Sequence, residues 1–585
     1  MSEPNLEIIR HSLSHILAQA IKELYPSVKL GIGPAIENGF YYDFDFGDIK
    51  LSEEDLLQIE KKMKHLIKQN QSWQQKLVDK KEAKKLLKDE PYKLDLLGEL
   101  ADKQASFYVN EVGGKQVFSD MCAGPHVAST KELNPDAFKL THLAGAYWRG
   151  DEKKPMLTRI YGAAFADKKD LDEYLQMLEE AKKRDHRKLG KDLELFIIDP
   201  DVGMGLPMWL PKGALIWRQI EDFWYQFHLK NGYQLVRSPH IGDIKMWETS
   251  GHTAFFKENM YEPIAVDKER YMLKPMNCPF HVKLYKSCPH SYRELPIRWA
   301  ESATVYRYEK SGELSGLTRV RGFTQDDAHI ICRQEQVKEE LLRVVKFIKD
   351  YFAVFGLTDY KVYLSLRDPE NKAKYAGNDK GWELTQKVLK EVADESGLDY
   401  ETEEGEAAFY GPKLDFKVKD VLGREWQCST LQFDFNLPER FDMTFINEKG
   451  EEERPYMLHR ALMGSFERFM AVLIENYAGA FPVWLAPVQA VIIPIAQAHE
   501  KYAQQLVEQM QGSDLRVEMM DSSESLSKRI RGAEMQKIPY MLVVGDKEVA
   551  SGCVTARSYK TGEQVEMKAD KFIERVQKEI TEKKI

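Results

Sequence analysis

Two pairs of residues near the start of the chain share a spacing that could support acid–base or metal chemistry. His11 and His15 lie four residues apart, which places both imidazoles on one face of a helix. Cys122 and His126 repeat that interval within the segment 120–126. Imidazole and thiolate are ligands that zinc prefers, so these four residues could form a metal site. Helix-face histidines in a polar cleft explain the pattern equally well.

A second set of potential ligands, Cys278, His329 and His459, has no local spacing. The intervals between them are 51 and 130 residues, and no metal-binding motif has such intervals. From the residues alone, a buried thiol and two hydrogen-bonded histidines are the better interpretation.

Arginines, aromatic residues and glycine are concentrated in two segments of the central region. Arg307 and Glu309 precede the segment 319–325, which contains two arginines and Phe323, and Arg468 stands near the start of an apolar helical pattern. Guanidinium groups pair with phosphate in a bidentate manner, and a helix N-terminus also attracts phosphate. The segments therefore could bind a nucleotide, although surface arginines paired with nearby carboxylates give the same pattern.

The composition indicates a large protein with several hydrophobic cores. The chain has 585 residues, 43% hydrophobic and 30% charged. This length predicts roughly three to five domains. The net charge of −9 excludes a general polyanion binder, whose surface would be broadly basic. Any nucleic acid must therefore be bound by local patches.

Cysteine usage and hydropathy favour a reducing, aqueous compartment. The six cysteines form no CxxC pair, which argues against a disulfide framework. The first residues lack the basic and apolar segments of a signal peptide, and the most apolar stretch, 470–496, is interrupted by acidic residues and prolines. We expect a cytoplasmic protein without a membrane span.

The periodicity of apolar residues divides the chain into four parts and predicts an α+β multidomain protein. Strand-like runs and a helix over 52–69 make the first part α+β, an amphipathic helix over 168–188 follows it, and a larger α+β region comes next. In the last part, strands and helices alternate, which predicts a small α/β domain with a largely parallel sheet. The predicted boundaries are 1–165, 166–190, 191–485 and 486–585.

Five ordered strings connect these parts to a known family. The chain resembles class II aminoacyl-tRNA synthetases, and the sequence between their shared motifs is similar to that of the threonyl enzymes. The resemblance implies an N-terminal editing domain, a catalytic domain on an antiparallel sheet and a C-terminal anticodon-binding domain. The strings are GYQLVRSP (232–239), MNCPFH (276–281), RVRGFTQDDAH (319–329), AFYGPKLDF (408–416) and HRALMGSFERF (459–469).

The resemblance implies that the chain activates L-threonine with ATP and transfers it to the 3′ end of tRNA(Thr). Such a displacement at phosphorus depends mainly on positioning and charge stabilisation. Mg²⁺ would accompany ATP and neutralise the pyrophosphate. The implied ATP contacts are Arg307 on the α-phosphate, Glu309 on the adenine amino group, Phe323 stacked on the ring, Arg468 on the bent triphosphate, and Arg319 on the phosphates.

The same resemblance implies that Cys278, His329 and His459 hold one Zn²⁺ per subunit, with a coordination place left open for substrate. An apolar pocket distinguishes valine from threonine by only about 10²-fold. An ion that binds both the amino group and the side-chain hydroxyl of threonine would reject valine, because valine has no hydroxyl to serve as the second ligand. The remaining pocket residues are implied to be Gln325, Asp327, Tyr410, Gln432 and Lys413, the last also a candidate catalytic residue with Arg307 and Arg468.

Serine has the same hydroxyl and amine, and it differs from threonine by a methyl group worth only ~1–3 kcal/mol. A hydrolytic second site is therefore expected. In the family, the constellation of His11, His15, Cys122 and His126 hydrolyses seryl-tRNA through water, generally without a required metal. Asp120 and Lys93 are implied as further members of this editing site.

Further implied roles concern transfer and partners. His252 would assist proton removal when the tRNA ribose attacks, although a histidine after glycine is equally compatible with a structural role. Glu548 and Arg557 would read anticodon bases by stacking and hydrogen bonding, although basic residues near a helix are usually a solvated face. The segment 232–239 would form the interface of a homodimer.

Two rival interpretations stay open, together with one departure from the family. A prolyl or other class II synthetase would share the common motifs but not the zinc trio, and a non-catalytic tRNA-binding paralogue would usually lose Arg307, Glu309 and Arg468. The resemblance begins at the editing domain, so we expect the ubiquitin-like domain that commonly precedes it in bacterial members to be absent.

Overall fold

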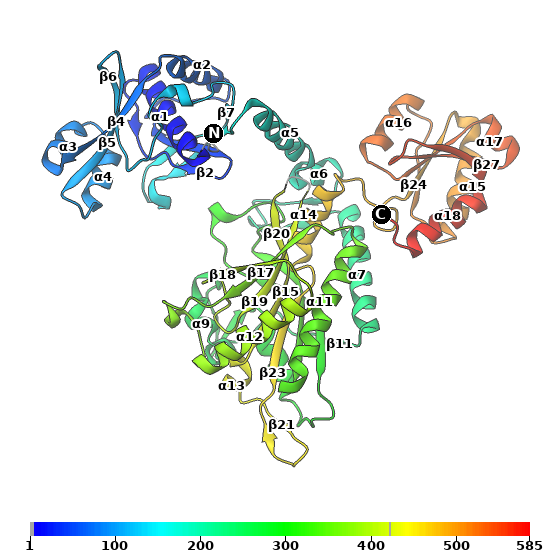
Figure 1. Ribbon diagram of the computed structural model, residues 1–585. Coiled ribbons are helices and arrows are strands. Elements are labelled where there is room, and N and C mark those ends of the chain that lie inside the picture. The colour runs from blue at the N-terminus through cyan, green and yellow to red at the C-terminus, as the bar shows by residue number, and fades with distance from the viewer. Residues whose placement is uncertain (1–4, 152, 421–422) are drawn as a thin grey trace. The chain divides into compact units, whose positions relative to one another are not determined.

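The structure is a computed structural model that describes residues 5–151, 153–420 and 423–585 (Figure 1). It divides into two compact units, Met1–Glu179 and Glu180–Ile585, each described by itself below. Among the helices of the described residues, none has both the length and the apolar content needed to cross a membrane. The expected α+β multidomain class is confirmed.

Unit 1 is built on an antiparallel sheet packed against two helices. Its core contains Ile16 and Leu17 of the first helix, Phe40 and Tyr42 of a central strand, and Met63 of the second helix. The sheet order is β1–β3–β8–β7, with β2 paired to β3. The elements are α1 (Leu6–Leu24), α2 (Asp55–Lys68), β1 (Lys29–Leu30), β2 (Ala35–Ile36), β3 (Gly39–Asp45), β7 (Phe138–Tyr147) and β8 (Met156–Ala164).

A smaller sheet in the same unit carries part of a polar cluster. Its strands are β4 (Ser72–Asp79), β5 (Gln104–Val112) and β6 (Lys115–Met121), flanked by α3 (Lys80–Leu86) and α4 (Pro91–Glu99). The β5–β6 turn uses Gly113 and Gly114, both at positive φ, the conformation that a two-residue hairpin turn requires. Strand β6 ends immediately before Cys122.

Unit 2 contains an eight-stranded sheet that is antiparallel except at its two edge pairs, β11–β15 and β17–β18. This confirms the antiparallel catalytic sheet. The strands, in spatial order, are β11 (Gln234–Leu235), β15 (Ile297–Tyr306), β16 (Gly322–Cys332), β23 (Tyr456–Ala461), β20 (Glu425–Asp434), β19 (Lys413–Lys419), β17 (Tyr360–Leu366) and β18 (Tyr400–Glu404).

Four long helices share one hydrophobic core with this sheet: α7 (Pro211–Lys230), α11 (Val337–Val354), α12 (Asp379–Glu395) and α14 (Phe466–Asn476). Other elements belong to this stretch of the chain. They include α5 (Lys168–Arg184), which runs across residue 179 where the units divide, α6 (His186–Asp192), β9 (Phe196–Ile197), β10 (Met208–Trp209), β12 (Ile241–Asp243), α8 (Lys245–Ser250), α9 (His252–Phe255), β13 (Ile264–Val266), β14 (Glu269–Leu273), α10 (Cys278–Tyr285), α13 (Asn436–Arg440), β21 (Phe445–Ile446) and β22 (Glu452–Glu453).

The register of the long strands decides which side chains meet. His329 on β16 lies opposite His459 on β23, and Gln432 on β20 lies opposite His459 from the other side. Side chains alternate between the faces of a strand, so Gln325, Asp327 and His329 share a face. Asp326 points the other way, where it forms a buried ion pair with Arg460 (3.0 Å).

The C-terminal part of unit 2 is a five-stranded α/β domain. Strands β25, β24 and β26 are parallel, as predicted, whereas β27 and β28 form an antiparallel hairpin that the sequence analysis missed. The expectation of a largely parallel sheet is therefore wrong for two of the five strands. The elements are β24 (Ala490–Pro494), α15 (Glu500–Gln511), β25 (Val517–Met519), α16 (Leu526–Met535), β26 (Tyr540–Val544), α17 (Asp546–Ser551), β27 (Cys553–Ser558), β28 (Gln564–Lys568) and α18 (Ala569–Thr581).

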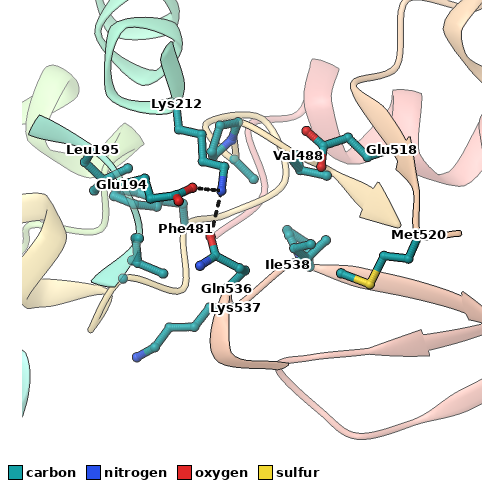
Figure 2. Close-up of a pocket in the computed structure, with 15 residues that line it drawn as sticks. Glu194, Leu195, Lys212, Phe481, Val488, Glu518, Met520, Gln536, Lys537 and Ile538 are labelled. Carbon is teal, nitrogen blue, oxygen red and sulfur yellow. Dashed lines mark hydrogen bonds and ion pairs between the residues drawn. The ribbon is translucent and has the colours of Figure 1, made fainter. Parts of the chain in front are cut away.

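Lys212 links the start of α7 to this C-terminal part. Its Nζ donates to Glu194 Oε2 and to Gln536 Oε1, each at 2.8 Å (Figure 2). A cavity of about 300 Å³ lies beside these groups, with Phe481 and Ile538 among its apolar lining. The two parts of unit 2 therefore meet through a mixed polar and apolar contact.

Candidate functional sites

Cys278, His329 and His459 come together although they are far apart in sequence. Two adjacent strands supply the histidines and the first residue of α10 supplies the thiol. The Nε2 of His329 lies 2.9 Å from the Nδ1 of His459, and one ligand atom from each residue lies within 4.8 Å of the others. Burial raises the pKa of the Cys278 thiol and lowers the pKa of His329.

The outward ring nitrogens of both histidines have partners. His329 Nδ1 lies 2.7 Å from His281 Nδ1, and His281 Nε2 lies 3.1 Å from Glu301 Oε2. His459 Nε2 lies 2.8 Å from Asp434 Oδ2. One nitrogen of each ring is thus fixed by an outer partner while the other faces the trio, the arrangement that metal-ligating histidines use.

This donor set fits a zinc ion. One thiol and two imidazole nitrogens are suitable zinc ligands, and three protein ligands leave one place for substrate. The sequence analysis missed His281, Glu301 and Asp434 as supporting residues. The signal available for His281 was its position three residues after Cys278, on the same side of a helix. No sequence signal marks the other two, because strand pairing brings them to the site.

A cavity of about 640 Å³ adjoins the trio and collects the predicted substrate residues. Cys278 and His459 belong to its lining, whereas His329 is not one of the described residues that line it. The predicted residues in the lining are Arg307, Glu309, Arg319, Phe323, Gln325, Asp327, Tyr410, Lys413, Gln432 and Arg468.

The arginines of this cavity are held by protein partners. Arg307 lies 5.1 Å from the centroid of the Phe323 ring, and burial lowers the pKa of its guanidinium. Arg319 pairs with Glu309 at 2.8 Å. Arg468 donates through Nε to the carbonyl of Thr318 (3.1 Å). A bound nucleotide that used Glu309 would therefore have to share this carboxylate with Arg319.

The predicted threonine contacts form a polar wall. Asp327 accepts from the Asn277 amide at 2.9 Å, and its other oxygen lies 3.8 Å from His329 Nε2. The Tyr410 hydroxyl donates to Gln432 Oε1 at 2.5 Å. Lys413 pairs with Asp415 at 2.5 Å. Acceptors and donors thus stand next to the ligand trio, as recognition of an amino acid requires.

His252 is buried and does not belong to the described lining of this cavity. Its Nδ1 lies 2.7 Å from Ser250 Oγ and its Nε2 lies 2.9 Å from the sulfur of Met276, which does line the cavity. Burial lowers its pKa to about 3. The ring is therefore neutral at physiological pH and separated from the cavity by one side chain.

The second cluster lies in unit 1. Helix α1 supplies His11 and His15, and the segment after β6 supplies Cys122 and His126. Cys122 Sγ lies 3.2 Å from His11 Nε2 and 3.5 Å from His126 Nε2, and one ligand atom from each of the four residues lies within 4.8 Å of the others.

Asp120 and Lys93 extend this cluster. Lys93 Nζ pairs with Asp120 Oδ1 at 2.9 Å, and His15 Nε2 lies 3.9 Å from Asp120 Oδ2. The Tyr42 hydroxyl donates to Asp120 Oδ2 at 2.6 Å. Sequence reasoning missed Tyr42, because only the pairing of α1 with β3 places its ring beside His15, with a centroid separation of 6.4 Å.

Burial disfavours the charged forms of the histidines and of the cysteine in the cluster of unit 1. It lowers the pKa of His15 and His126 and raises the pKa of the Cys122 thiol to about 11. Neutral imidazoles can accept a proton from water, whereas a thiol at this pKa is a poor nucleophile. The donor set is also compatible with a metal ion, which would deprotonate the thiol.

The two predicted anticodon residues lie in the C-terminal domain, and neither lines one of the two cavities described above. Glu548 is buried, accepts from the Gly545 amide at 3.0 Å and from the Thr555 hydroxyl at 2.8 Å, and so caps α17. Arg557 on β27 pairs with Glu534 at 3.0 Å.

Three segments of the chain match known domain families. Residues 108–161 match the threonyl and alanyl tRNA synthetase second additional domain. Residues 261–477 match the tRNA synthetase class II core domain (G, H, P, S and T), and residues 489–579 match an anticodon binding domain.

Full-length relatives are similar over almost the whole chain. A threonine–tRNA ligase of Sulfurihydrogenibium sp. (strain YO3AOP1) is 52% identical, with 99% of this chain and 90% of the relative covered. One from Thermus thermophilus is 49% identical, with 99% and 89% covered. A solved structure described as the RNA binding domain of threonyl-tRNA synthetase from Cryptosporidium parvum Iowa II superposes with a TM-score of 0.63 at 37% identity, covering 68% of this chain and 98% of the other.

Proposed function

The chain belongs to the threonine–tRNA ligase family of class II aminoacyl-tRNA synthetases, and from this premise we propose how its own residues select threonine, activate it and remove errors. It is an ATP-dependent aminoacyl-tRNA ligase with an additional domain of the editing type. The finer assignments below concern the zinc ion, the residues, the edited amino acid and the oligomeric state.

Cys278, His329 and His459 hold one zinc ion per subunit. The observation that carries this assignment is the pair of outer contacts, His281 on His329 and Asp434 on His459, which leave the inner nitrogens of both rings facing the buried thiol. These three residues would hold the ion, which would supply Lewis-acid ligation for the amino group and the side-chain hydroxyl of threonine. Valine lacks the second of these ligands and is rejected beyond the ~10²-fold that shape alone supplies.

Gln325, Asp327, Tyr410, Lys413 and Gln432 orient the bound amino acid. Asp327 is fixed by the Asn277 amide, so its carboxylate is available in one orientation for the substrate. The Tyr410–Gln432 hydrogen bond fixes the opposite part of the wall. Rigid polar groups of this kind reduce the entropy lost when the substrate binds.

Adenylate formation takes place between this wall and the arginines. The threonine carboxylate attacks the α-phosphorus of ATP, a new O–P bond forms, and pyrophosphate leaves. Arg307 stabilises the charge at the α-phosphate, while Arg319 and Arg468 hold the outer phosphates and Mg²⁺ accompanies them. Glu309 and Phe323 position the adenine.

Transfer then joins the amino acid to tRNA(Thr). The terminal ribose hydroxyl attacks the carbonyl carbon of the adenylate, and AMP leaves. Burial lowers the pKa of His252 to about 3, so the imidazole is neutral but only weakly basic. It can accept the hydroxyl proton when Met276 moves aside and the bound substrates raise that pKa toward neutrality. Glu548 and Arg557 contribute to anticodon recognition in the C-terminal domain, whose fold positions the tRNA.

The cluster of unit 1 hydrolyses seryl-tRNA. His11, His15 and His126 orient water and accept its proton, Cys122 lies between two of these rings, and Lys93 with Asp120 keeps the wall polar. Serine is the amino acid to be removed because it carries the same two zinc ligands as threonine. The enzyme is a cytoplasmic homodimer whose interface includes residues 232–239.

Amino-acid-dependent ATP–pyrophosphate exchange tests the central proposal. We expect exchange with threonine, weaker exchange with serine and almost none with valine or proline. Removal of zinc with a chelator should abolish threonine-dependent exchange, and added zinc should restore it. Unchanged exchange in metal-free protein would contradict the zinc assignment, and no exchange with any amino acid from folded, zinc-loaded protein would favour a non-catalytic tRNA-binding paralogue.

A further inference from the structure

A third group of ionisable side chains lies outside both sites. His186 is the first residue of α6, which lies beside α14 (Figure 1), and Glu475 belongs to the last turn of α14. Both are buried, with 4% and 3% of their surfaces exposed. The sequence analysis gave neither residue a role in chemistry.

The group has the composition of a metal site but its ligand atoms are already used. His186 Nδ1 lies 2.7 Å from Glu475 Oε1, which also accepts from the His186 amide at 3.1 Å. Glu475 Oε2 is paired with Arg424. The remaining nitrogen, His186 Nε2, accepts from the backbone N–H of Leu317 at 3.0 Å. Each ring nitrogen and carboxylate oxygen therefore has a protein partner.

These contacts determine the tautomer of His186. The Leu317 N–H can only donate, so His186 Nε2 must be unprotonated and the ring proton must be on Nδ1, where it is donated to Glu475. The neutral ring is thus a bridge between a carboxylate of α14 and a backbone amide of the loop that joins β15 to β16.

The loop residue next to this amide touches the nucleotide-binding machinery. Thr318 accepts from Arg468 Nε through its carbonyl at 3.1 Å, and the turn is closed by the Thr318 and Arg319 amides, which both donate to the Ser315 carbonyl. Arg319 pairs with Glu309 at 2.8 Å. His186 therefore fixes the loop one residue away from the carbonyl that holds Arg468.

The close approach of the ring requires glycine in the loop. Gly316 has φ +49, and a Cβ at this position would lie 2.1 Å from His186 Nε2. These contacts involve both ends of helix α14, because Arg468 lies in its first turn and Glu475 in its last. The loop therefore contacts α14 at two places: through the His186 ring to Glu475, and directly from the Thr318 carbonyl to Arg468.

We infer that His186 is a positioning residue for the activation step: it holds the loop so that Thr318 keeps Arg468, and Glu309 keeps Arg319, in the orientation that ATP needs. This inference depends on the proposed assignment of Arg319 and Arg468 to ATP. It gives helix α6 a part in nucleotide binding that does not require contact with substrate.

Two amide substitutions separate the two bonds of His186. In His186→Asn the amide reaches only the position of Nδ1, so the bond to Glu475 can persist while the Leu317 N–H loses its acceptor. In His186→Gln the amide oxygen reaches the position of Nε2 and can still accept from Leu317. Thermal unfolding of both variants measures the structural cost, and ATP–pyrophosphate exchange measures KM for ATP and for threonine separately.

We expect His186→Asn to raise KM for ATP about tenfold, the equivalent of ~1.4 kcal/mol, with KM for threonine changed less than about twofold. His186→Gln should stay close to the parent protein. Gly316→Ala, which displaces the loop while leaving His186 intact, should reproduce the selective rise in KM for ATP. Lys188→Gln, at an exposed position of the same helix, is the matched control.

The inference is overturned if His186→Asn matches the parent, if both KM values rise equally, or if His186→Gln is as impaired as His186→Asn. Arg468→Ala serves as the reference. If this variant loses activation while His186→Asn and Gly316→Ala show no rise in KM for ATP, the inference fails and the assignment of Arg468 stands. If Arg468→Ala retains activation, the assignment of ATP residues fails and the inference with it.

Discussion

At the residue scale, the Cys278 thiol decides whether the buried trio can hold a metal. Burial raises its pKa, so only a nearby cation would keep it as a thiolate at neutral pH. We predict that Cys278→Ser binds less than about a tenth of the zinc of the parent, since three-ligand sites rarely tolerate the loss of one ligand. Zinc per subunit, measured by atomic emission after gel filtration, checks this prediction. The exposed Cys288→Ser is the control, and normal zinc in Cys278→Ser would refute the assignment.

His11 allows the editing proposal to be separated from synthesis. Its Nε2 contacts Cys122 at 3.2 Å in unit 1, and a positioned acid or base contributes typically 10²–10⁴-fold to a rate. We expect His11→Ala to hydrolyse preformed seryl-tRNA at least ~10²-fold more slowly while threonylation stays within about twofold of the parent. His65→Ala, exposed on α2, should change neither rate. Equal loss of both reactions would show that His11 acts on the fold and not on hydrolysis.

Glu467 predicts a pH dependence of stability. Burial raises the pKa of its carboxyl to about 8. The Thr324 N–H donates to this carboxyl at 3.0 Å and partly offsets the rise. Because the folded pKa exceeds the unfolded value of about 4.5, the stability contribution is present at low pH and is lost as pH rises from about 4.5 through 8. The pKa difference corresponds to roughly 5 kcal/mol, an order-of-magnitude figure.

We therefore expect the free energy of unfolding of the parent to fall between pH 6 and pH 9, and to fall about 3 kcal/mol less in Glu467→Gln, which cannot ionise. Chemical denaturation at both pH values, followed by tryptophan fluorescence, measures the difference. Parallel pH profiles of the two proteins would mean that Glu467 is ionised in the native state at both pH values.

At the element scale, the turn after β6 carries Cys122 and His126 of the cluster in unit 1. Gly124 has φ +71, and a Cβ there would lie 2.2 Å from the Tyr108 hydroxyl. Gly124→Ala must therefore displace either the segment that joins Cys122 to His126 or the Tyr108 ring, which lies 4.5 Å from the His126 ring between centroids. Backbone strain of this kind costs about 1–3 kcal/mol. We predict at least a tenfold loss of seryl-tRNA hydrolysis with little change in threonylation.

Gly47→Ala is the matched control for that prediction, because Gly47 also has positive φ but an added Cβ would have no neighbour within 4 Å. It adds backbone strain in the same unit without the collision. Hydrolysis rates that fall equally in both variants would attribute the effect to strain in general and not to the position of the turn.

Local patterns predicted the elements better than their contacts. The i, i+4 histidines of α1 do share a face, and the helix predicted over 52–69 is α2 (Asp55–Lys68). The β27–β28 hairpin was missed because its strands are short and half exposed, so their apolar residues do not form a run. Such strands are stabilised by pairing, which sequence periodicity does not record.

Long-range contacts of the sites were beyond prediction for the same reason. Asp434 reaches His459 because β20 pairs with β23, and Tyr42 reaches Asp120 through packing of two sheets and α1. Neither residue has a spacing that relates it to the site. The family resemblance supplied the trio itself, whereas the residues that orient it came from the register of the strands.

At the scale of the whole molecule, the net charge of −9 has a consequence for tRNA binding. Affinity must come from a limited number of local phosphate contacts, so its salt dependence should correspond to few released counterions. The family domains distribute these contacts over the chain, with the anticodon-binding fold at 489–579 and the class II core at 261–477.

The last prediction concerns the oligomeric state, which we propose to be a homodimer. Strand β11 is an edge strand of the eight-stranded sheet, and large apolar side chains on and beside it are exposed: Leu229 at 55%, Leu235 at 39% and Ile241 at 47%. An unpaired strand edge and exposed large apolar side chains are features of a surface on which another chain can pair. We expect the parent to sediment at twice the mass of Leu235→Asp, since a buried, unpaired carboxylate disrupts an interface. Leu86→Asp, exposed in unit 1, should remain dimeric. A parent that sediments as a monomer at micromolar concentration would leave these apolar groups uncovered and refute the proposed interface.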